Sequence, residues 1–449
     1  MFDRRVAPNA ISYNAAISAM GKGSRWQLAL HLLTTMRMSE APNVRSYSAA
    51  ISACEKSSQW QAALCLFGSM PGNALMPSEV SCNAAISACE KAGQWQFALG
   101  LLSSMPELRI APDRISYNAA ISACAKEGQW QVALSLLNTM QAIILKPDEI
   151  SYSAAISSCD QGGQVELALG LLNKMIPNNL RPDAISYSAA ISACAKRGQW
   201  HGALSLLREM SELRIEPNVV TYSAAITACD QGGQWQLALD LLSLMPEARV
   251  VPNEITYNAA ISACEKASQW QLALNLLSLM PEARMVPNKI TYNAAISACE
   301  KSGEWQLALT LMSLMPEAML VPNEITYSAA ISACEKGGQW QLALNLLSLM
   351  PEARVVPNEI TYNAAISACE KGGQWQLALT LLSMMPDAML VPNEITYNAA
   401  MSAFEKGGQW QLALNLLSLM PEAGVVPNDI TFNAAISACE RAAASGSWY

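Results

Sequence analysis

The sequence predicts an all-α protein built from tandem helical hairpins. A unit of 35 residues recurs along almost the whole chain of 449 residues. Hydrophobic residues make up 52% of the chain and are mainly Ala, Leu, Ile and Met, a mixture that favours helix over strand. Each unit carries two apolar patterns with helical spacing, separated by a short break. These observations predict an α-solenoid of stacked antiparallel helix pairs.

The repeat is defined by the stretch from Glu254 to Asn288, EITYNAAISACEKASQWQLALNLLSLMPEARMVPN. Successive units are 35 residues apart, except for an interval of 34 between the first two. The residue after the opening aromatic marks each unit, at Asn14, Ser48, Asn83, Asn118, Ser153, Ser188, Ser223, Asn258, Asn293, Ser328, Asn363, Asn398 and Asn433. We therefore expect a lead at residues 1–9, an array of 12 repeats plus a half repeat at 10–441, and a tail at 442–449.

The first helix of each unit is predicted from the apolar spacing of Ile255, Ile261 and Cys264. Small residues such as the pair Ala259 and Ala260 allow neighbouring helices to approach closely. The break that follows reads Gly-Gly, Ala-Gly or Ala-Ser across repeats, and Gly suits the left-handed conformation that often ends a helix.

The second helix is predicted to begin at Trp270 and to end near Met280, because Pro281 disfavours helical geometry in the residue before it. Its Trp and Met side chains are expected to pack in the core rather than to stack on ligands. One helix pair cannot bury its own apolar face, so successive units must stack against one another.

The composition argues against several classes of function. Thirteen cysteines are present, but eleven recur once per repeat and are interpreted as buried thiols. With only two histidines in the chain, we expect no metal site, no cofactor and no catalytic residue, and therefore no enzyme activity. No apolar run approaches the 18 or so residues that span a membrane. The net charge of −8 has the wrong sign for a protein that coats a polyanion by bulk electrostatics.

The repeat resembles that of the pentatricopeptide repeat family from about Ala10 to Arg441. The resemblance rests on the 35-residue unit, the Tyr-Asn opening, the Cys near the end of the first helix, the Ala-Leu of the second helix and the closing Pro-Asn or Pro-Asp. It implies a right-handed superhelix that binds single-stranded RNA with one nucleotide per repeat. It also implies a role in organelle RNA processing, stabilisation or translation in the chloroplast or mitochondrion, although no transit peptide is visible in this sequence.

In this family the residue after the aromatic and the residue after the closing Pro together contact one base. The pairs in chain order are Asn14 and Asn43, Ser48 and Ser78, Asn83 and Asp113, Asn118 and Asp148, Ser153 and Asp183, Ser188 and Asn218, Ser223 and Asn253, Asn258 and Asn288, Asn293 and Asn323, Ser328 and Asn358, Asn363 and Asn393, and Asn398 and Asn428. Ser leaves room for a purine, whereas Asn fills the space beside a pyrimidine; Asp only accepts hydrogen bonds, whereas Asn can also donate them. The resulting target is 5′-Y-A-U-U-G-A-A-Y-Y-A-Y-Y-3′, where Y is a pyrimidine and the eighth and ninth positions are preferably C.

Two further sets of residues match RNA-contacting positions of the family. Apolar residues expected to separate successive bases are Ile115, Ile150, Val220, Ile255 and their equivalents, with Arg45 as a departure in the second unit. Lysines expected to contact phosphates are Lys56, Lys91, Lys126, Lys196, Lys266, Lys301, Lys336, Lys371 and Lys406, with Lys22 and Arg441 in the same register. If most of these lysines engage, log affinity should fall with log salt with a slope of about −7.

Other interpretations of the same residues stay open. Asn, Asp and Ser after each Pro are also the preferred N-caps of helices. The lysines could compensate the dipole at the end of the first helix. The alternative function is a protein-binding helical-repeat scaffold, and protein partners or self-association through uncapped ends of the array are compatible with it.

Overall fold

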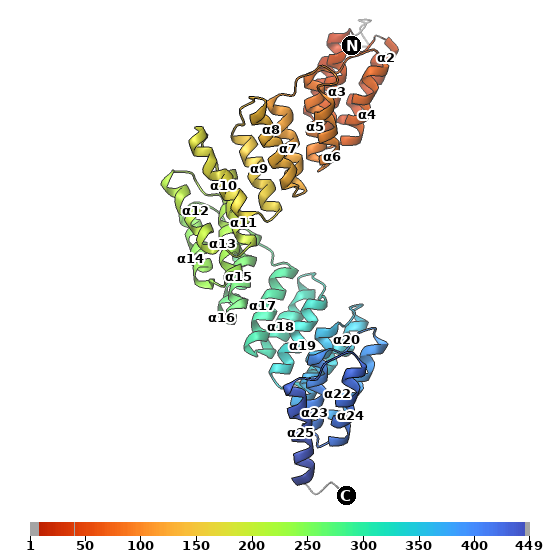
Figure 1. Ribbon diagram of the computed structural model, residues 1–449, viewed down its shortest axis with the longest axis vertical. Helices are drawn as coiled ribbons and strands as arrows, with labels where there is room; N and C mark the ends of the chain where they lie inside the picture. The colour runs from red at the N-terminus through yellow and green to blue at the C-terminus, as the bar shows by residue number, and fades with distance from the viewer. Residues whose placement is uncertain (1–8, 40, 445–449) are drawn as a thin grey trace. The chain divides into compact units, whose positions relative to one another are not determined.

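The computed structural model describes residues 9–39 and 41–444, and within these ranges the regular secondary structure is entirely helical (Figure 1). The chain divides into two compact units, Met1–Gly232 and Gly233–Tyr449, and each is described by itself. The predicted all-α array of stacked helix pairs is confirmed in both units.

The first unit contains α1 to α13, and the second contains α14 to α25. The helices of the first unit are α1 (Ala10–Lys22), α2 (Trp26–Ser39), α3 (Val44–Lys56), α4 (Trp60–Gly72), α5 (Glu79–Lys91), α6 (Trp95–Ser104), α7 (Arg114–Lys126), α8 (Trp130–Ala142), α9 (Glu149–Gln161), α10 (Val165–Met175) with the short 3₁₀ turn η2 (Ile176–Asn178), α11 (Ala184–Lys196), α12 (Trp200–Glu212) and α13 (Val219–Gln231). Those of the second unit are α14 (Trp235–Glu247), α15 (Glu254–Lys266), α16 (Trp270–Glu282), α17 (Lys289–Ser302), α18 (Trp305–Glu317), α19 (Glu324–Lys336), α20 (Trp340–Glu352), α21 (Glu359–Lys371), α22 (Trp375–Asp387), α23 (Glu394–Lys406), α24 (Trp410–Glu422) and α25 (Asp429–Ala444).

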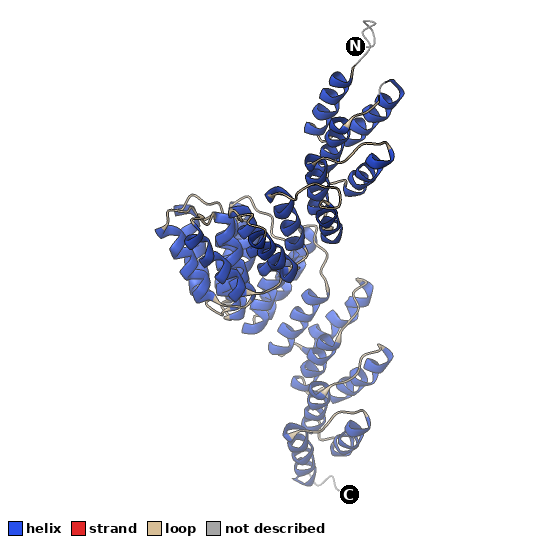
Figure 2. Cartoon of the chain, turned by 45° about the horizontal axis from the view of Figure 1, so that its top comes forward, coloured by secondary structure: helices blue, strands red, loops and turns tan. Residues whose placement is uncertain are grey.

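Each unit has two layers of helices, joined by short loops (Figure 2). The first helices of successive repeats pack directly against one another, as α7 does on α9 and α17 on α19. Within a unit, a second helix packs on the first helix of its own repeat and on that of the next repeat, as α16 does on α15 and α17. A residue at a given position of the first helix therefore lies beside its equivalents in the neighbouring repeats of the same unit.

The core between the layers holds the residues that the sequence predicted to be buried. In the type repeat, Ile261 and Cys264 of the first helix and Ala273 and Met280 of the second are fully buried. The tryptophans are half-buried and pack at the edge of this core, as Trp305 does. The expectation that these Cys and Met side chains pack in the core is confirmed.

The end of the second helix differs from the prediction. In the type repeat α16 continues past Met280 to Glu282 and contains Pro281 in its last turn. The helix ends because Arg284 adopts a left-handed conformation, with φ of 59°. Its backbone N–H donates to the Pro281 carbonyl at 2.9 Å, and the next N–H, of Met285, reaches the Met280 carbonyl at 2.9 Å. This pair of bonds is the Schellman motif, and burial of Met280 holds that residue helical despite the following proline.

The boundaries predicted for the ends of the array fall partly outside the described residues. α1 begins at Ala10, as expected, and most of the predicted lead lies outside the described residues. At the other end α25 continues to Ala444, past the expected end of the array at Arg441. Among the helices of residues 9–39 and 41–444, none combines the length and the apolar character that a membrane span requires.

Candidate nucleic-acid interface

The residue after each closing proline is the N-cap of the following first helix. In the type repeat the Asn288 side-chain oxygen Oδ1 accepts a hydrogen bond from the Thr291 backbone N–H at 3.0 Å. The Thr291 hydroxyl in turn accepts the Asn288 backbone N–H at 3.0 Å, which completes a capping box. The helix-capping interpretation of this position is therefore confirmed. The cap occupies Oδ1 of Asn288 and leaves its amide group Nδ2 for other partners.

In the type repeat the two side chains of the predicted base-reading pair meet at the buried hydroxyl of the capping box. The Thr291 Oγ1 lies 2.7 Å from Asn258 Oδ1 and 3.0 Å from Asn288 Oδ1. Thr291 itself is fully buried. Residues 30 positions apart in the sequence are thus joined at one site, as the prediction required.

Equivalent hydroxyls make the same link in other repeats. They join Thr326 to Asn293 at 2.7 Å, Thr396 to Asn363 at 2.6 Å, Thr431 to Asn398 at 2.9 Å and Ser116 to Asn83 at 2.6 Å. The N-cap partners Asn323, Asn393, Asn428 and Asp113 each accept a hydrogen bond from the backbone N–H of the same Thr or Ser.

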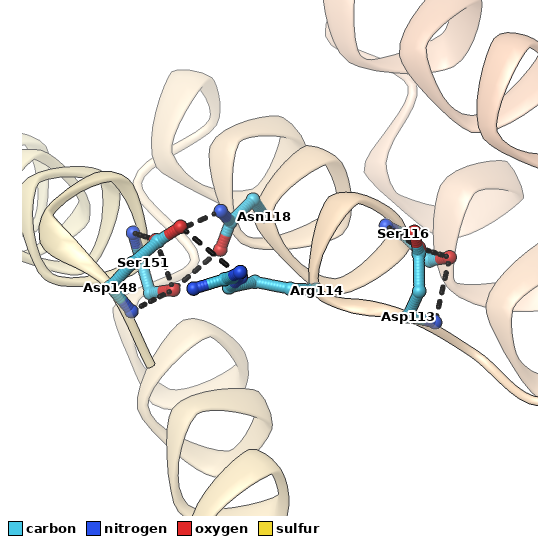
Figure 3. Close-up of polar contacts among 6 residues, drawn as sticks. All are labelled: Asp113, Arg114, Ser116, Asn118, Asp148 and Ser151. Carbon is cyan, nitrogen blue, oxygen red and sulfur yellow. Dashed lines mark hydrogen bonds and ion pairs between the residues drawn. The ribbon is translucent and has the colours of Figure 1, made fainter. Parts of the chain in front are cut away.

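Figure 3 shows the site formed by Asn118 and Asp148. Asn118 Nδ2 donates to Asp148 Oδ1 at 3.0 Å, and the Ser151 hydroxyl lies 2.5 Å from Asn118 Oδ1. The Arg114 Nε lies 3.5 Å from Asp148 Oδ2. Burial opposes ionisation of Asp148, but the hydrogen bonds from Ser151 and Asn118 and the charge of Arg114 outweigh it and lower the pKa of its carboxyl group.

We call the residue after the opening aromatic the inner residue of its repeat. Where the inner residue is serine and not asparagine, its hydroxyl donates a hydrogen bond to a carbonyl of its own helix. The Ser153 Oγ donates to the Glu149 carbonyl at 2.7 Å and lies 2.7 Å from the Ser186 Oγ. Ser48, Ser188, Ser223 and Ser328 likewise donate to the carbonyl four residues earlier. The room for a purine beside these smaller side chains stays a prediction.

The remaining predicted base-reading residues are likewise either inner residues of a first helix or N-caps of the next one. Asn14 is half-buried in α1, and its partner Asn43 caps α3. Ser78, Asp183, Asn218, Asn253 and Asn358 cap α5, α11, α13, α15 and α21. Ser223 belongs to the first unit and Asn253 to the second.

An exposed apolar side chain stands one turn before each inner residue. Ile255 precedes Asn258 by three positions and is 61% exposed. Ile115, Ile150 and Val220, at the equivalent place, are similarly exposed, and Arg45 takes this place in α3. An apolar side chain therefore stays largely exposed at this position in most repeats. Its role in separating bases stays a prediction.

The predicted phosphate-binding lysines lie against acidic residues of the preceding repeat. Lys336 Nζ is 2.7 Å from Glu300 Oε1, and Lys371 Nζ is 2.6 Å from Glu335 Oε1. Similar pairs join Lys91 to Glu55, Lys196 to Asp160, Lys301 to Glu265, Lys406 to Glu370 and Arg441 to Glu405, whereas Lys126 Nζ donates to the backbone carbonyl of Glu90. We call these contacts the lysine ladder.

The lysine ladder was not predicted from the sequence. The recurring Glu-Lys dipeptide, seen at Glu335 and Lys336, could have indicated it, because stacked helices bring each lysine beside the acidic residue one repeat earlier. The lysines retain partial exposure, with 41% of the Lys371 side chain accessible. Contact with phosphate stays a prediction.

One hollow in the first unit gathers all three kinds of predicted RNA-contacting residue. A groove of about 670 Å³ is lined by the pair Ser48 and Ser78, by Arg45 and Val80 at the apolar position, and by Lys56. The first helices therefore present the inner residue, the N-cap, the separating residue and the lysine to the same space.

The described part of the chain contains no cluster of three or more His, Cys, Asp or Glu side chains arranged to hold a metal ion. Cys264 is representative of the buried cysteines, and burial raises the pKa of its thiol to about 11. A thiol whose pKa is raised in this way is protonated at physiological pH and is a poor nucleophile.

Sequence families of the pentatricopeptide repeat match most of the chain. The family described as pentatricopeptide repeat domain matches residues 205–267. The PPR repeat family matches residues 77–126, 112–161, 252–299, 287–336, 357–406 and 392–441, and the PPR repeat matches 11–40, 45–74, 150–176, 185–215 and 325–355.

Solved structures of helical-repeat proteins are similar to the chain. The crystal structure of the pentatricopeptide repeat protein PPR10 from maize has 22% sequence identity and a TM-score of 0.59, and the match covers 96% of this chain and 72% of that one. PPR10 in complex with an 18-nt psaJ RNA element matches at 19% identity, a TM-score of 0.40, and 98% and 80% coverage. Yeast Rmd9p in complex with a 16-nt target RNA matches at 11% identity, a TM-score of 0.34, and 93% and 88% coverage. No curated protein matches the chain.

Proposed function

The chain belongs to the pentatricopeptide repeat family, and from this membership we propose that it binds a single strand of RNA of about 12 nucleotides, with one nucleotide read by each repeat. The observation that carries the proposal is the pairing of residues such as Asn258 and Asn288 at the buried Thr291 hydroxyl. In the repeats where it is present, the pairing fixes two polar side chains on the layer of first helices.

The base edge would meet the amide groups that the protein leaves available. The Oδ1 atoms of Asn258 and Asn288 are both directed at Thr291, so their Nδ2 groups are the donors left for a base. The exposed side chains of Ile255 and Ile290 lie one repeat apart and would cover the two faces of the base. Excluding water in this way strengthens the hydrogen bonds and the penalty for a mismatched base.

Phosphates would be bound by the lysine ladder, with each lysine exchanging its acidic partner for a phosphate oxygen. Binding of this kind acts by occupying the strand, which protects it from nucleases or keeps it from pairing. No step in this function requires a catalytic group. We place the function in chloroplast or mitochondrial RNA metabolism by resemblance to the family, and a fluorescent fusion of the protein would test that location.

The direct test is fluorescence anisotropy with the predicted 12-nucleotide RNA and a scrambled RNA of equal composition, each at two salt concentrations. We expect tighter binding of the predicted RNA, by roughly tenfold or more for several mismatched bases. Equal affinity for the two RNAs would overturn base reading, and no affinity for either would favour the protein scaffold.

A recoded variant sharpens this test. Asn258→Ser should shift the preference at the eighth nucleotide from a pyrimidine toward A, because the smaller side chain makes room for a purine. Asn275→Ser is the matched control, since Asn275 is exposed on α16 of the same repeat, in the layer of second helices. The control should leave the preference unchanged.

A further inference from the structure

In several repeats the first residue of the first helix touches the N-cap of the next repeat. In the type repeat the Asn288 amide Nδ2 donates to the Glu254 carboxylate. The same contact joins Asn358 to Glu324, Asn393 to Glu359 and Asn428 to Glu394. The sequence analysis did not identify this position, because the partners are 34 residues apart and neither one varies with the other in an obvious way.

One repeat carries the opposite charge at this position and has a different arrangement of hydrogen bonds. Lys289 takes the place of Glu254, and an ammonium group cannot accept a hydrogen bond from the N-cap amide. In that repeat the Asn293 Nδ2 donates to the Asn323 Oδ1 at 3.2 Å. The pair Asn258 and Asn288 and the pair Asn293 and Asn323 therefore have the same residues, but the first helix begins with Glu254 in one repeat and with Lys289 in the other.

The first unit shows the same contact with aspartate caps. Arg114 approaches Asp148 Oδ2 at 3.5 Å. At the preceding repeat Glu79 meets Asp113, and the hydrogen bond and charge of Asp113 raise the pKa of Glu79. The side chain at this position therefore interacts with the N-cap whether its own charge is positive or negative.

Stabilisation of the helix dipole does not explain this position. Acidic residues in the first turn favour the helix, and Glu254 fits that role. Lys289 and Arg114 stand at the same place with the unfavourable sign. A second function of the position is needed to account for both charges.

We propose that the first residue of the first helix, in the repeats where it is charged, is a third determinant of base choice, an inference that rests on the proposed function. Glu254 accepts one of the two amide hydrogens of Asn288, so the amide and the carboxylate form a donor beside an acceptor. Cytosine presents the complement, a ring nitrogen acceptor beside an amino donor. Lys289 supplies a donor in place of the acceptor, which fits the carbonyl O4 of uracil.

This inference assigns either C or U to positions of the target at which the base-reading pairs specify only a pyrimidine. Repeats with Glu254, Glu359 and Glu394 select C at the eighth, eleventh and twelfth nucleotides. The repeat with Lys289 selects U at the ninth, in place of the C preferred from the reading pair alone. The target becomes 5′-Y-A-U-U-G-A-A-C-U-A-C-C-3′.

The test uses the full chain and RNAs that differ only by C or U at the eighth or the ninth nucleotide, together with an RNA that carries A at the eighth. The wild-type protein should prefer C at the eighth and U at the ninth. Glu254→Lys should shift the ratio of the two affinities at the eighth nucleotide toward U by about tenfold, and Lys289→Glu should shift the ratio at the ninth toward C by a similar factor. Ratios are compared because a change of charge alters the affinity for every RNA.

Glu282→Lys makes the same charge change at the exposed end of α16 and serves as the control. It should change the affinity for both RNAs by the same factor and leave their ratio alone. If the wild-type chain distinguishes a pyrimidine from a purine at the eighth nucleotide but neither swap moves the ratio, the inference is wrong and the proposed function stands. If the wild-type chain makes no such distinction, the proposed function itself fails.

Discussion

Replacing Thr291 by Val tests whether the buried hydroxyl organises the reading site. The two side chains have nearly the same shape, and Thr291 is fully buried, so the change removes hydrogen bonds with little change in packing. The hydroxyl contacts Asn258 Oδ1 at 2.7 Å and Asn288 Oδ1 at 3.0 Å and accepts the Asn288 N–H at 3.0 Å.

The expected loss of stability follows from the polar groups that lose the Thr291 hydroxyl as a hydrogen-bond partner. A buried polar group that loses its only partner costs about 1–3 kcal/mol. Asn258 and Asn288 are half-buried, so water can replace part of what they lose, and the Thr291 backbone N–H still donates to Asn288. We therefore expect a local loss of stability of about 1–2 kcal/mol at the start of α17.

Hydrogen exchange of the backbone amides in the first turn of α17 measures this loss locally, which suits an array of repeats that need not unfold in one step. RNA binding gives a second readout, because an unanchored Asn258 should discriminate less well at the eighth nucleotide. Thr291→Ser is the control that keeps the hydroxyl, and Ser116 shows that serine fills this role in another repeat. Equal protection and equal discrimination in the Val and Ser variants would refute the role assigned to the hydroxyl.

Two further predictions concern ionisable groups. Cys65 is an exposed cysteine, Cys439 is partly exposed and Cys264 represents the buried ones. A thiol reagent near pH 8 should therefore show a fast phase that the double substitution Cys65→Ser and Cys439→Ser removes, and a fast phase that survives both substitutions would contradict the burial of the others. Arg114→Met should destabilise the chain at pH 7 by up to about 1 kcal/mol, since the lowered pKa of Asp148 stabilises the fold above the unfolded value of 3.8. That difference should vanish in urea unfolding once the pH has fallen through the pKa of Asp148, and a difference that persists there would point to another role for Arg114.

Much of the fold could be predicted from the sequence because its period is regular. The spacing of Ile261 and Cys264 identified the buried face of the first helix, and both residues are fully buried. Asn288 was recognised both as an N-cap and as half of a pair, and its link to Asn258 through one hydroxyl agrees with both interpretations. These predictions depend on local spacing and on the fact that a repeated unit must stack.

Contacts between repeats could not be predicted in the same way. The approach of Glu254 to Asn288 depends on the distance and rotation between stacked helices, and no pattern within one repeat specifies these. The end of α16 was misjudged because Pro281 was expected to stop the helix at the residue before it, whereas the proline lies in the last turn and the helix ends where Arg284 adopts the left-handed conformation. Satisfying the last carbonyls of the helix compensates for the strain of that conformation.

The acidic net charge becomes easier to reconcile with RNA binding once the lysine ladder is considered. Lys371 is already paired with Glu335 at 2.6 Å, and a partly exposed pair of this kind is worth about 0.2–1 kcal/mol. A phosphate can displace so weak a partner, but each exchange subtracts that amount from the affinity. Glu335→Gln should therefore raise RNA affinity by up to about fivefold, whereas Glu282→Gln, which removes a charge from the end of α16, should raise it less. If Glu335→Gln leaves the affinity no higher than the control does, Lys371 does not reach the strand, and binding must depend on base contacts alone.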